Sequence, residues 1–228
     1  MGKLGVITGA SRGIGRACAL GFAERGVDLA LLGRPSEGLE HTRARCAAQG
    51  ITARSYACDM TDAEAIARAA SDLVADHGPP QLVVNNAGIL QHGPKVHEIA
   101  VEDWDHVMAV NLRGPFVLCR ALLPAMLTAG KGRFIHVSSI SGTVDCPQMA
   151  HYGASKWGLI GFSKALAAEL RGTGLQSLAV LPGSVRTAML DLTPFEPAMT
   201  PEEVASVIIY HGLDAPNPVN GAAIEVYG

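Results

Sequence analysis

The chain alternates between two patterns of hydrophobic and polar positions along its whole length. Short apolar runs, each closed within two residues by Gly, Asn, Ser or Pro, occupy residues 4–7, 29–32, 82–84, 134–137 and 178–181. Such near-continuous runs are typical of strands that are buried on both faces. Between them, apolar residues recur at helical spacing, most clearly over 14–22, 66–73 and 159–170. The alternation predicts an α/β fold in which a single doubly wound parallel sheet carries helices on both faces.

The pattern continues without a linker or repeat that would divide the chain, so we expect one domain over residues 1–228. A chain of 228 residues that is 48% hydrophobic is long enough to bury one core of ordinary size. The least regular segment is 191–201, which contains Pro194, Pro197 and Pro201. Clustered prolines of this kind are typical of a surface loop.

Charge and cysteine content exclude several classes of protein. The net charge is −3, which is too mild for a protein that binds nucleic acid through a basic surface. The five cysteines include no CxxC pair, so neither a disulfide framework nor a zinc site is expected, and a reducing cytoplasm fits best. Prolines and amides interrupt the longest uncharged stretch, 77–94, and no basic region precedes an apolar N-terminal segment. We therefore expect no membrane span and no secretion signal.

A glycine-rich turn follows the first apolar run. Gly9, Gly13 and Gly15 have the spacing Gly-x3-Gly-x-Gly, and a helical pattern begins directly after them. In a parallel sheet, the first strand-to-helix turn brings free backbone amides to a helix N-terminus, where a pyrophosphate can bind. The spacing differs from the commoner G-x-G-x-x-G, so the turn alone is equally compatible with a plain tight turn.

The end of the second apolar run bears on the choice of cofactor. A chain that binds NAD carries Asp or Glu at this point for the adenosine ribose, whereas this chain has Gly33 followed by Arg34. The glycine removes a carboxylate that would repel a 2′-phosphate, and Arg34 with Arg12 could bind that phosphate. This indicates NADP(H); the alternative is that both arginines are ordinary solvated surface residues.

Three polar residues form a second candidate site. Tyr152 and Lys156 are four residues apart on one face of a helical stretch, and Ser139 follows the strand predicted at 134–137. An ammonium about 4 Å from a phenol, at an effective dielectric near 20, favours the phenolate by roughly 4 kcal/mol and so lowers its pKa. Tyr152 would then be a proton donor, and Ser139 could donate to a developing oxyanion. Alternatively, Tyr152 covers a core and Lys156 is a solvated helix charge.

These residues together resemble the short-chain dehydrogenase/reductase family, whose fold is of the Rossmann type. Nearly the whole chain shares the resemblance, and the similarity is greatest to 3-oxoacyl-acyl-carrier-protein reductases and related carbonyl reductases. The matching positions, in the family's order, are Thr8-Gly9-x3-Gly13-x-Gly15, Asp59, Asn85-Asn86-Ala87-Gly88, Asn111, Ser139, Tyr152-x3-Lys156 and Pro182-Gly183-x3-Thr187.

The resemblance implies a role for each catalytic position. Tyr152 would be the general acid in carbonyl reduction, and Lys156 would bind the nicotinamide ribose and lower the Tyr152 pKa. Ser139 would bind the substrate oxygen, while Asn111 would break its helix and position a water that relays protons to Lys156.

The resemblance also implies a cofactor site. Asp59 and Met60 would flank the adenine, whereas Val185 and Thr187 would meet the nicotinamide amide and the phosphates. The full set of implied cofactor-binding residues is Gly9, Ser11, Arg12, Gly13, Ile14, Gly15, Arg34, Asp59, Met60, Asn85, Ala87, Gly88, Tyr152, Lys156, Pro182, Gly183, Val185 and Thr187. No metal is expected, because His92, His97 and His151 form no metal-binding pattern.

Two departures from the family concern substrate and assembly. Only 13 residues, 188–200, separate Thr187 from the helix start at Pro201, so we expect a shortened substrate loop and an open pocket. The chain ends at Gly228 without the family's usual Asp-Gly-Gly turn. The family implies a homodimer or homotetramer, in which the helices carrying Tyr152 and Asn111 pair. The apolar residues expected at that interface are Val117, Leu118, Trp157, Phe162 and Leu166.

The sequence thus predicts an NADP(H)-dependent oxidoreductase that reduces a ketone to a secondary alcohol, with Tyr152 as general acid. The substrate would be a small-molecule or carrier-tethered carbonyl compound, including a 3-oxoacyl thioester. Two alternatives are an NAD-dependent secondary alcohol dehydrogenase and a non-catalytic protein that senses the cofactor.

Overall fold

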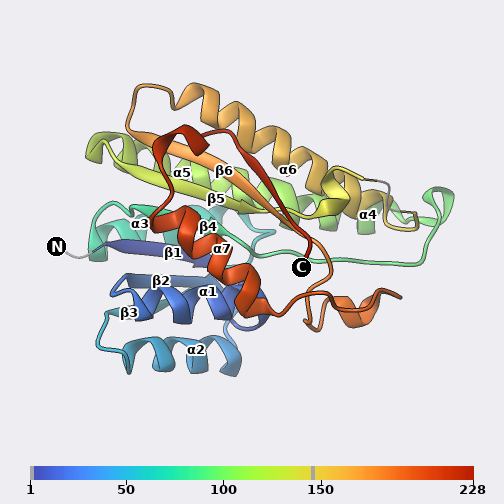
Figure 1. The fold of residues 1–228 in the computed structure, drawn as a ribbon, viewed down its shortest axis with the longest axis horizontal. Helices are drawn as coiled ribbons and strands as arrows, with labels where there is room; N and C mark the ends of the chain where they lie inside the picture. The colour runs from blue at the N-terminus through green and yellow to red at the C-terminus, as the bar shows by residue number, and fades with distance from the viewer. Residues whose placement is uncertain (1–2, 145–146) are drawn as a thin grey trace.

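A parallel sheet organises the molecule. The computed structural model describes residues 3–144 and 147–228, and within them seven strands pair in the order β3-β2-β1-β4-β5-β6-β7 (Figure 1). The strands are β1 (Leu4–Thr8), β2 (Asp28–Gly33), β3 (Ala53–Ala57), β4 (Leu82–Asn85), β5 (Gly132–Val137), β6 (Leu175–Pro182) and β7 (Ala223–Val226). Every pairing between neighbours is parallel. The strand order reverses between β1 and β4, which is where ligands bind in folds of this kind.

Helices cover both faces of the sheet. They are α1 (Gly13–Glu24), α2 (Glu37–Ala47), α3 (Ala63–His77), α4 (Val101–Met108), α5 (Gly114–Ala129), α6 (Ala150–Glu169) and α7 (Pro201–Leu213). On one face α1 packs against α2 and α7, and on the other α3 packs against α5 and α4 against α6 (Figure 1). The predicted doubly wound sheet is confirmed.

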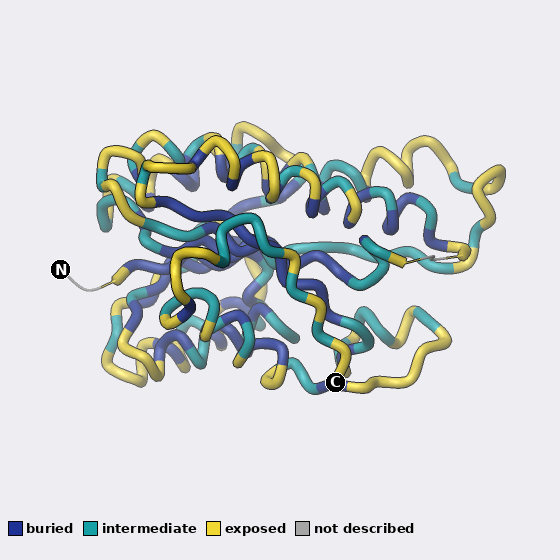
Figure 2. Tube along the Cα trace, turned by 45° about the horizontal axis from the view of Figure 1, so that its top comes forward, coloured by how far each residue is buried: buried dark blue, intermediate teal, exposed yellow. Residues whose placement is uncertain are grey.

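The core consists of two apolar layers, one on each side of the sheet. Neighbouring strand residues face opposite layers: Ile7 packs with Phe22 of α1, whereas Val6 packs with Leu122 of α5. Central strands are therefore buried on both faces, which explains the near-continuous apolar runs in the sequence. Figure 2 shows the buried trace concentrated in the central strands and on the inner sides of the helices.

Two strands do not correspond to any of the apolar runs in the sequence. Both lie at edges of the sheet: β3 reads Ala-Arg-Ser-Tyr-Ala, and β7 reads Ala-Ile-Glu-Val with alternating exposure. An edge strand is partly exposed to solvent, so it does not require an apolar residue at each position.

The segment 188–200 is a largely exposed loop, as predicted. It contains one short 3-10 helix, η4 (Leu190–Leu192), and exposes the side chains of Leu192 and Phe195. Its last part is anchored, because Met199 is buried and forms a β-bridge with Val185.

Helical structure runs from α4 through the π-helical turn η2 (Ala109–Arg113) into α5. The stretch Val101–Ala129 has the length and hydropathy of a membrane span. Its apolar residues Leu118, Leu122 and Met126 nevertheless pack in the core layer against the sheet, as in a core helix of a globular domain.

Two residues assigned to a subunit interface are core residues, so that part of the prediction is wrong. Leu118 and Leu166 are 0% and 5% exposed, because each lies on the side of its helix that faces the sheet. Trp157 is 56% exposed, and the exposed Phe116 ring packs edge-on against the partly buried Phe162.

The described cysteines are buried thiols. Cys18, Cys46, Cys58 and Cys119 form no disulfide, and burial raises the pKa of Cys46 and Cys58 to about 11 and that of Cys119 to about 12. They are therefore protonated and unreactive at neutral pH. The fifth cysteine, Cys146, lies outside the described residues.

Candidate active site

The turn between β1 and α1 leaves no room for a side chain at its glycine positions. Gly9 and Gly13 have φ values of 70° and 53°, which residues with a Cβ rarely adopt. A Cβ on Gly9 would lie 2.9 Å from the Cα of Ala87, and one on Gly15 would overlap the Gly9 carbonyl. The N-cap Arg12 makes no side-chain capping bond. The backbone amides of the first turn of α1 therefore form a narrow cradle suited to the pyrophosphate of a dinucleotide.

Arg16 braces this turn from within α1. Its guanidinium donates to the Ser11 carbonyl and, through Nε, to Thr42 Oγ1 of α2 at 3.2 Å. Ser11 and Ile14 are half-buried beside the cradle, where the sequence places them. The loop is thus fixed before any ligand binds.

Hydrogen bonds join the turn to the end of β4. Thr8 Oγ1 accepts from the backbone N–H groups of Asn86 and Ala87 at 3.0 and 2.9 Å. The Asn86 amide donates in return to the carbonyls of Thr8 and Gly9 at 2.9 and 3.3 Å. These bonds hold the carboxyl ends of β1 and β4 together as one rigid floor.

Two side chains expected beside the cofactor face the core instead. Asn85 is 1% exposed and donates to Cys119 Sγ at 3.4 Å, with His136 Nδ1 at 3.3 Å, because strand alternation turns it toward the α5 layer. Met60 is 7% exposed, and its carbonyl lies against Gly114, where a Cβ would come within 2.8 Å. Only the backbone of these two residues can face a cofactor.

The ends of β2 and β3 meet the glycine turn at the same edge of the sheet. Arg34 and Arg12 are exposed there, and Gly33 leaves the end of β2 without a carboxylate. The pKa of Asp59 is lowered, mainly because its carboxylate accepts from the N–H and hydroxyl of Thr61, both at 2.8 Å, and further by the charge of Arg34. Asp59 is thus an ionised acceptor held in place at this edge of the sheet.

Tyr152 and Lys156 lie together near the start of α6. The Lys156 ammonium is 5.6 Å from the centre of the Tyr152 ring and donates to the Val137 carbonyl at 3.0 Å. Burial lowers the pKa of Lys156 to about 8, because the charged form is taken out of water. Both side chains are buried, at 6% and 4% exposure, which contradicts the alternative of a solvated helix lysine.

Ser139 lies at the turn between β5 and the 3-10 helix η3 (Ile140–Gly142). Its hydroxyl accepts from the Ser141 N–H at 3.1 Å, which fixes the Oγ lone pairs and leaves its proton for another acceptor. Ser138 next to it donates to the Lys156 carbonyl at 2.9 Å and so joins this turn to α6.

Asn111 lies in the π-helical turn η2, where the helix departs from α geometry as the resemblance implies. Its side chain makes paired bonds with Ile89: Oδ1 accepts from the N–H and Nδ2 donates to the carbonyl, both at 2.9 Å. Nδ2 also donates to Ser155 Oγ at 3.0 Å. A Cβ on Gly88 would lie 3.4 Å from Asn111 Oδ1 and 3.5 Å from Lys156 Nζ, so the two polar groups border the same glycine.

The end of β6 lies at the same carboxyl edge of the sheet. Gly183, after Pro182, donates its N–H to the Val226 carbonyl at 2.8 Å, and a Cβ on it would lie 3.6 Å from Met199. Thr187 reaches the pyrophosphate cradle, because a Cβ on Gly13 would lie 3.2 Å from its methyl group. The carboxyl edge of the sheet thus brings together the residues predicted to bind a cofactor and those predicted to be catalytic.

The model of the short chain dehydrogenase family matches residues 3–195. This chain belongs to the short-chain dehydrogenases. Two curated relatives of this dehydrogenase are each 34% identical to it over its full length. They are D-threitol dehydrogenase of Mycolicibacterium smegmatis, covered over 92% of its length, and 3-oxoacyl-[acyl-carrier-protein] reductase of Thermotoga maritima, covered over 97%.

Solved structures of the same family superpose closely on this dehydrogenase. A metagenomic short-chain oxidoreductase in complex with NADP has a TM-score of 0.87 and 36% identity, with 99% of this chain and 96% of that chain covered. Acetoin dehydrogenase from Salmonella typhimurium has a TM-score of 0.91 and 27% identity, with 100% and 95% covered.

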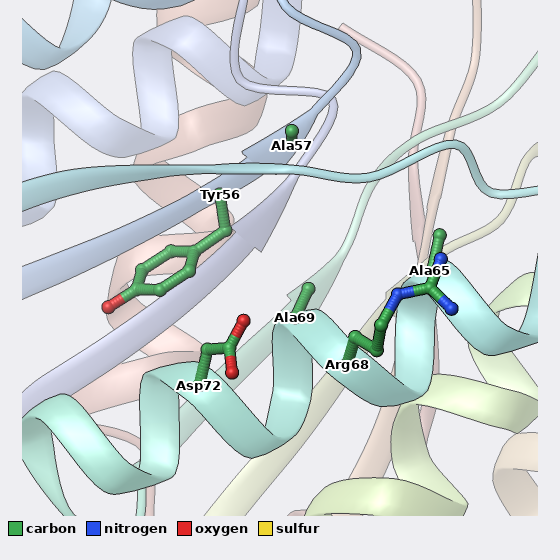
Figure 3. Close-up of a pocket in the computed structure, with 6 residues that line it drawn as sticks. All are labelled: Tyr56, Ala57, Ala65, Arg68, Ala69 and Asp72. Atoms are coloured by element: carbon green, nitrogen blue, oxygen red, sulfur yellow. The ribbon is translucent and has the colours of Figure 1, made fainter.

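A surface hollow of this dehydrogenase lies away from the catalytic residues. It has a volume of about 230 Å³ and lies between β3 and α3 (Figure 3). Its lining residues are Tyr56, Ala57, Ala65, Arg68, Ala69 and Asp72. None of them belongs to the glycine turn or to the catalytic set, so the hollow has no part in the chemistry described above.

Three residues without a role predicted from the sequence hold the dehydrogenase site together. Thr8 and Asn86 stand in the matching motifs, and their pairing follows once β1 and β4 are known to be neighbours. Ser155 accepts from Asn111 and donates to the Tyr152 carbonyl at 2.7 Å. Its only sequence signal is a small polar residue on the buried face of α6.

Proposed function

We propose that this dehydrogenase reduces a ketone to a secondary alcohol with NADP(H), and that Tyr152 donates the proton. The observation that carries the proposal is the buried Lys156 beside Tyr152, at the edge of the sheet where the glycine cradle lies. A non-catalytic cofactor sensor would gain nothing from holding an ammonium in a site where burial lowers its pKa to about 8.

In this mechanism Ser139 and Tyr152 act on the substrate oxygen, and Lys156 and Asn111 act through Tyr152. Ser139 donates a hydrogen bond to the carbonyl oxygen and stabilises the negative charge that develops there. The bound nicotinamide supplies the hydride to the carbonyl carbon. The Tyr152 hydroxyl gives its proton to the same oxygen, so an alcohol and a phenolate form, and the Lys156 charge stabilises the phenolate. Asn111 lies next to Lys156, where a water could return a proton.

The proposed preference for NADP(H) rests on the end of β2. Gly33 leaves no carboxylate to repel a 2′-phosphate, while the exposed guanidinium groups of Arg34 and Arg12 are available to bind one. The narrow cradle at Gly9 and Gly13 fits the pyrophosphate that NAD and NADP share. The solved relative in complex with NADP supports the same choice.

The substrate we propose is a bulky or carrier-tethered carbonyl compound, including a 3-oxoacyl thioester. The exposed segment 188–200 supports this proposal, because so short a loop cannot cover a substrate with helices. The relative named 3-oxoacyl-[acyl-carrier-protein] reductase is consistent with it.

A substrate panel tests the proposal directly. Simple ketones and 3-oxoacyl thioesters would be followed at the NADPH absorbance band, with NADH in parallel. Tyr152→Phe keeps the ring and removes the proton, so we expect kcat to fall roughly 10²- to 10⁴-fold while NADPH affinity changes little. Turnover at the wild-type rate in Tyr152→Phe would reject Tyr152 as the acid.

We further propose that the protein acts in the cytoplasm as a homodimer or homotetramer. The exposed Trp157 and Phe116 on α6 and α5 supply apolar area for such an interface. Light scattering at micromolar concentration tests this, and the mass of a single chain would contradict it.

A further inference from the structure

Three polar side chains from different elements form a hydrogen-bonded chain that ends one residue before Tyr152. The Asp103 carboxylate on α4 accepts from Gln91 Nε2 at 3.3 Å, and Gln91 Oε1 lies 3.1 Å from His151 Nε2 on α6. A carboxylate only accepts hydrogen bonds, so the Gln91 amide turns its NH2 group toward Asp103. Its oxygen then faces His151, which fixes the imidazole proton on Nε2. We call Asp103, Gln91 and His151 the positioning chain.

His151 depends on this arrangement because it is fully buried. Its exposure is 0%, and burial lowers its pKa although the charge of Asp103 opposes the change. The ring is therefore neutral at pH 7 and has one N–H to satisfy, which Gln91 accepts. Loss of the acceptor would leave a buried donor unpaired directly beside Tyr152.

A second bond ties the same two segments together. Gly93 N–H donates to the carbonyl of Gln148 at 3.1 Å, and Gln148 has φ 60°, a conformation rare for residues with a Cβ. The loop after β4 is thus joined at two points to the segment that leads into Tyr152.

The other end of this loop is bonded to the catalytic set. Ile89 makes two bonds with the Asn111 side chain, which donates to Ser155, and Ser155 donates to the Tyr152 carbonyl. The loop after β4 is therefore bonded to α6 at residues on either side of Tyr152 in the sequence, through Gln91 to His151 and through Asn111 to Ser155.

We infer that the positioning chain holds the Tyr152 hydroxyl in place for proton transfer, an inference that rests on the proposed function. Its members act through Tyr152 and are positioning residues. Proton transfer is sensitive to geometry, because a displacement of about 1 Å can cost roughly 10²-fold in rate. Loss of the positioning chain should therefore lower kcat with little effect on cofactor affinity.

Matched variants test the inference with NADPH and the best ketone from the substrate panel. His151→Leu removes the N–H, whereas His151→Gln places an amide N–H near the position of Nε2. Gln91→Met removes the acceptor at a partly exposed position of the loop after β4. Gln176→Met is the control, because Gln176 makes a similar bond to Asn217 at 2.6 Å at the opposite end of the sheet.

We expect His151→Leu and Gln91→Met to lower kcat about tenfold, with KM and the Kd of NADPH within about twofold of wild type. His151→Gln should recover kcat to within about threefold of wild type. The double variant that combines His151→Leu with Gln91→Met should be no slower than His151→Leu alone, since each single change already breaks the same bond. Gln176→Met should lower Tm without lowering kcat.

Equal losses in His151→Gln and His151→Leu, additive losses in the double variant, or an unchanged kcat in Gln91→Met would each overturn the inference. Failure of the proposed function looks different: the wild type would not oxidise NADPH with any carbonyl compound, or Tyr152→Phe would match the wild type.

Discussion

Replacing Lys156 by methionine should stabilise the cofactor-free protein and abolish turnover. The ammonium is 4% exposed, and burial lowers its pKa from 10.5 to about 8. A pKa that falls from 10.5 to about 8 means that the folded protein carries the charge at a cost of roughly 3 kcal/mol. Methionine removes that cost but also removes the bond to the Val137 carbonyl, which offsets about 1–2 kcal/mol. We expect a net gain of roughly 1–2 kcal/mol at pH 7.

The gain should depend on pH in a defined direction. Below pH 8 the lysine is protonated in both the folded and the unfolded chain, so the folded protein bears the full free-energy cost of the buried charge. Between about pH 8 and 10.5 the folded protein releases the proton while the unfolded chain keeps it, so wild-type stability rises with pH relative to the variant. The advantage of the variant should therefore vanish or reverse near pH 10.

Urea unfolding of the cofactor-free proteins, at one fixed protein concentration, measures this difference at pH 7 and near pH 10. Lys164→Met is the control, because Lys164 is an exposed lysine on the same helix, and its free energy of unfolding should change by less than about 0.5 kcal/mol. A Lys156→Met variant that is less stable than the wild type at pH 7, or an advantage independent of pH, would refute the reasoning.

Three further results are expected. Gly33→Asp should shift the ratio of the Kd values for NADP(H) and NAD(H) at least about tenfold toward NAD(H), through repulsion of the 2′-phosphate; an unchanged ratio in fluorescence titrations would contradict this. Gly15→Ala should weaken the binding of NADP(H) and NAD(H) about equally, because its Cβ would overlap the Gly9 carbonyl, and the same titrations would measure the rise in both Kd values. Across ketones of increasing size, kcat/KM should rise because segment 188–200 leaves the pocket open, and a sharp preference for the smallest ketone would count against an open pocket.

The central part of the fold could be predicted from sequence because both faces of the inner strands are buried. Every residue of β1 and β4 is buried between the two core layers, so the apolar run indicates the strand directly. Edge strands β3 and β7 lack this signal because one side is solvated. The family resemblance likewise places an interface on two helices without showing which face of each helix is covered, which is why Leu118 and Leu166 were expected at a partner although they face the sheet.

Spacing along the chain predicts only part of the candidate site. Tyr152 and Lys156 share a helix face by spacing alone, and Asn111 was identified only through the family resemblance. The contact of His151 with Gln91 joins residues 60 positions apart, and no local sequence pattern predicts it. Strand alternation could have shown that Asn85 shares the face of the buried Val83.

The pairing of β1 with β4 at the centre of the sheet also affects how the chain folds. β1 gains β2 as a neighbour early, but its other side stays open until Leu82–Asn85 is available. The bonds from Asn86 and Ala87 to Thr8 then close a loop of nearly 80 residues, and ordering so long a loop is entropically slow. During synthesis the first 80 residues therefore expose the unpaired backbone edge of the apolar strand β1, where aggregation competes with folding. Expression at lower temperature, or fusion to a soluble partner at the N-terminus, should raise the yield by protecting that edge.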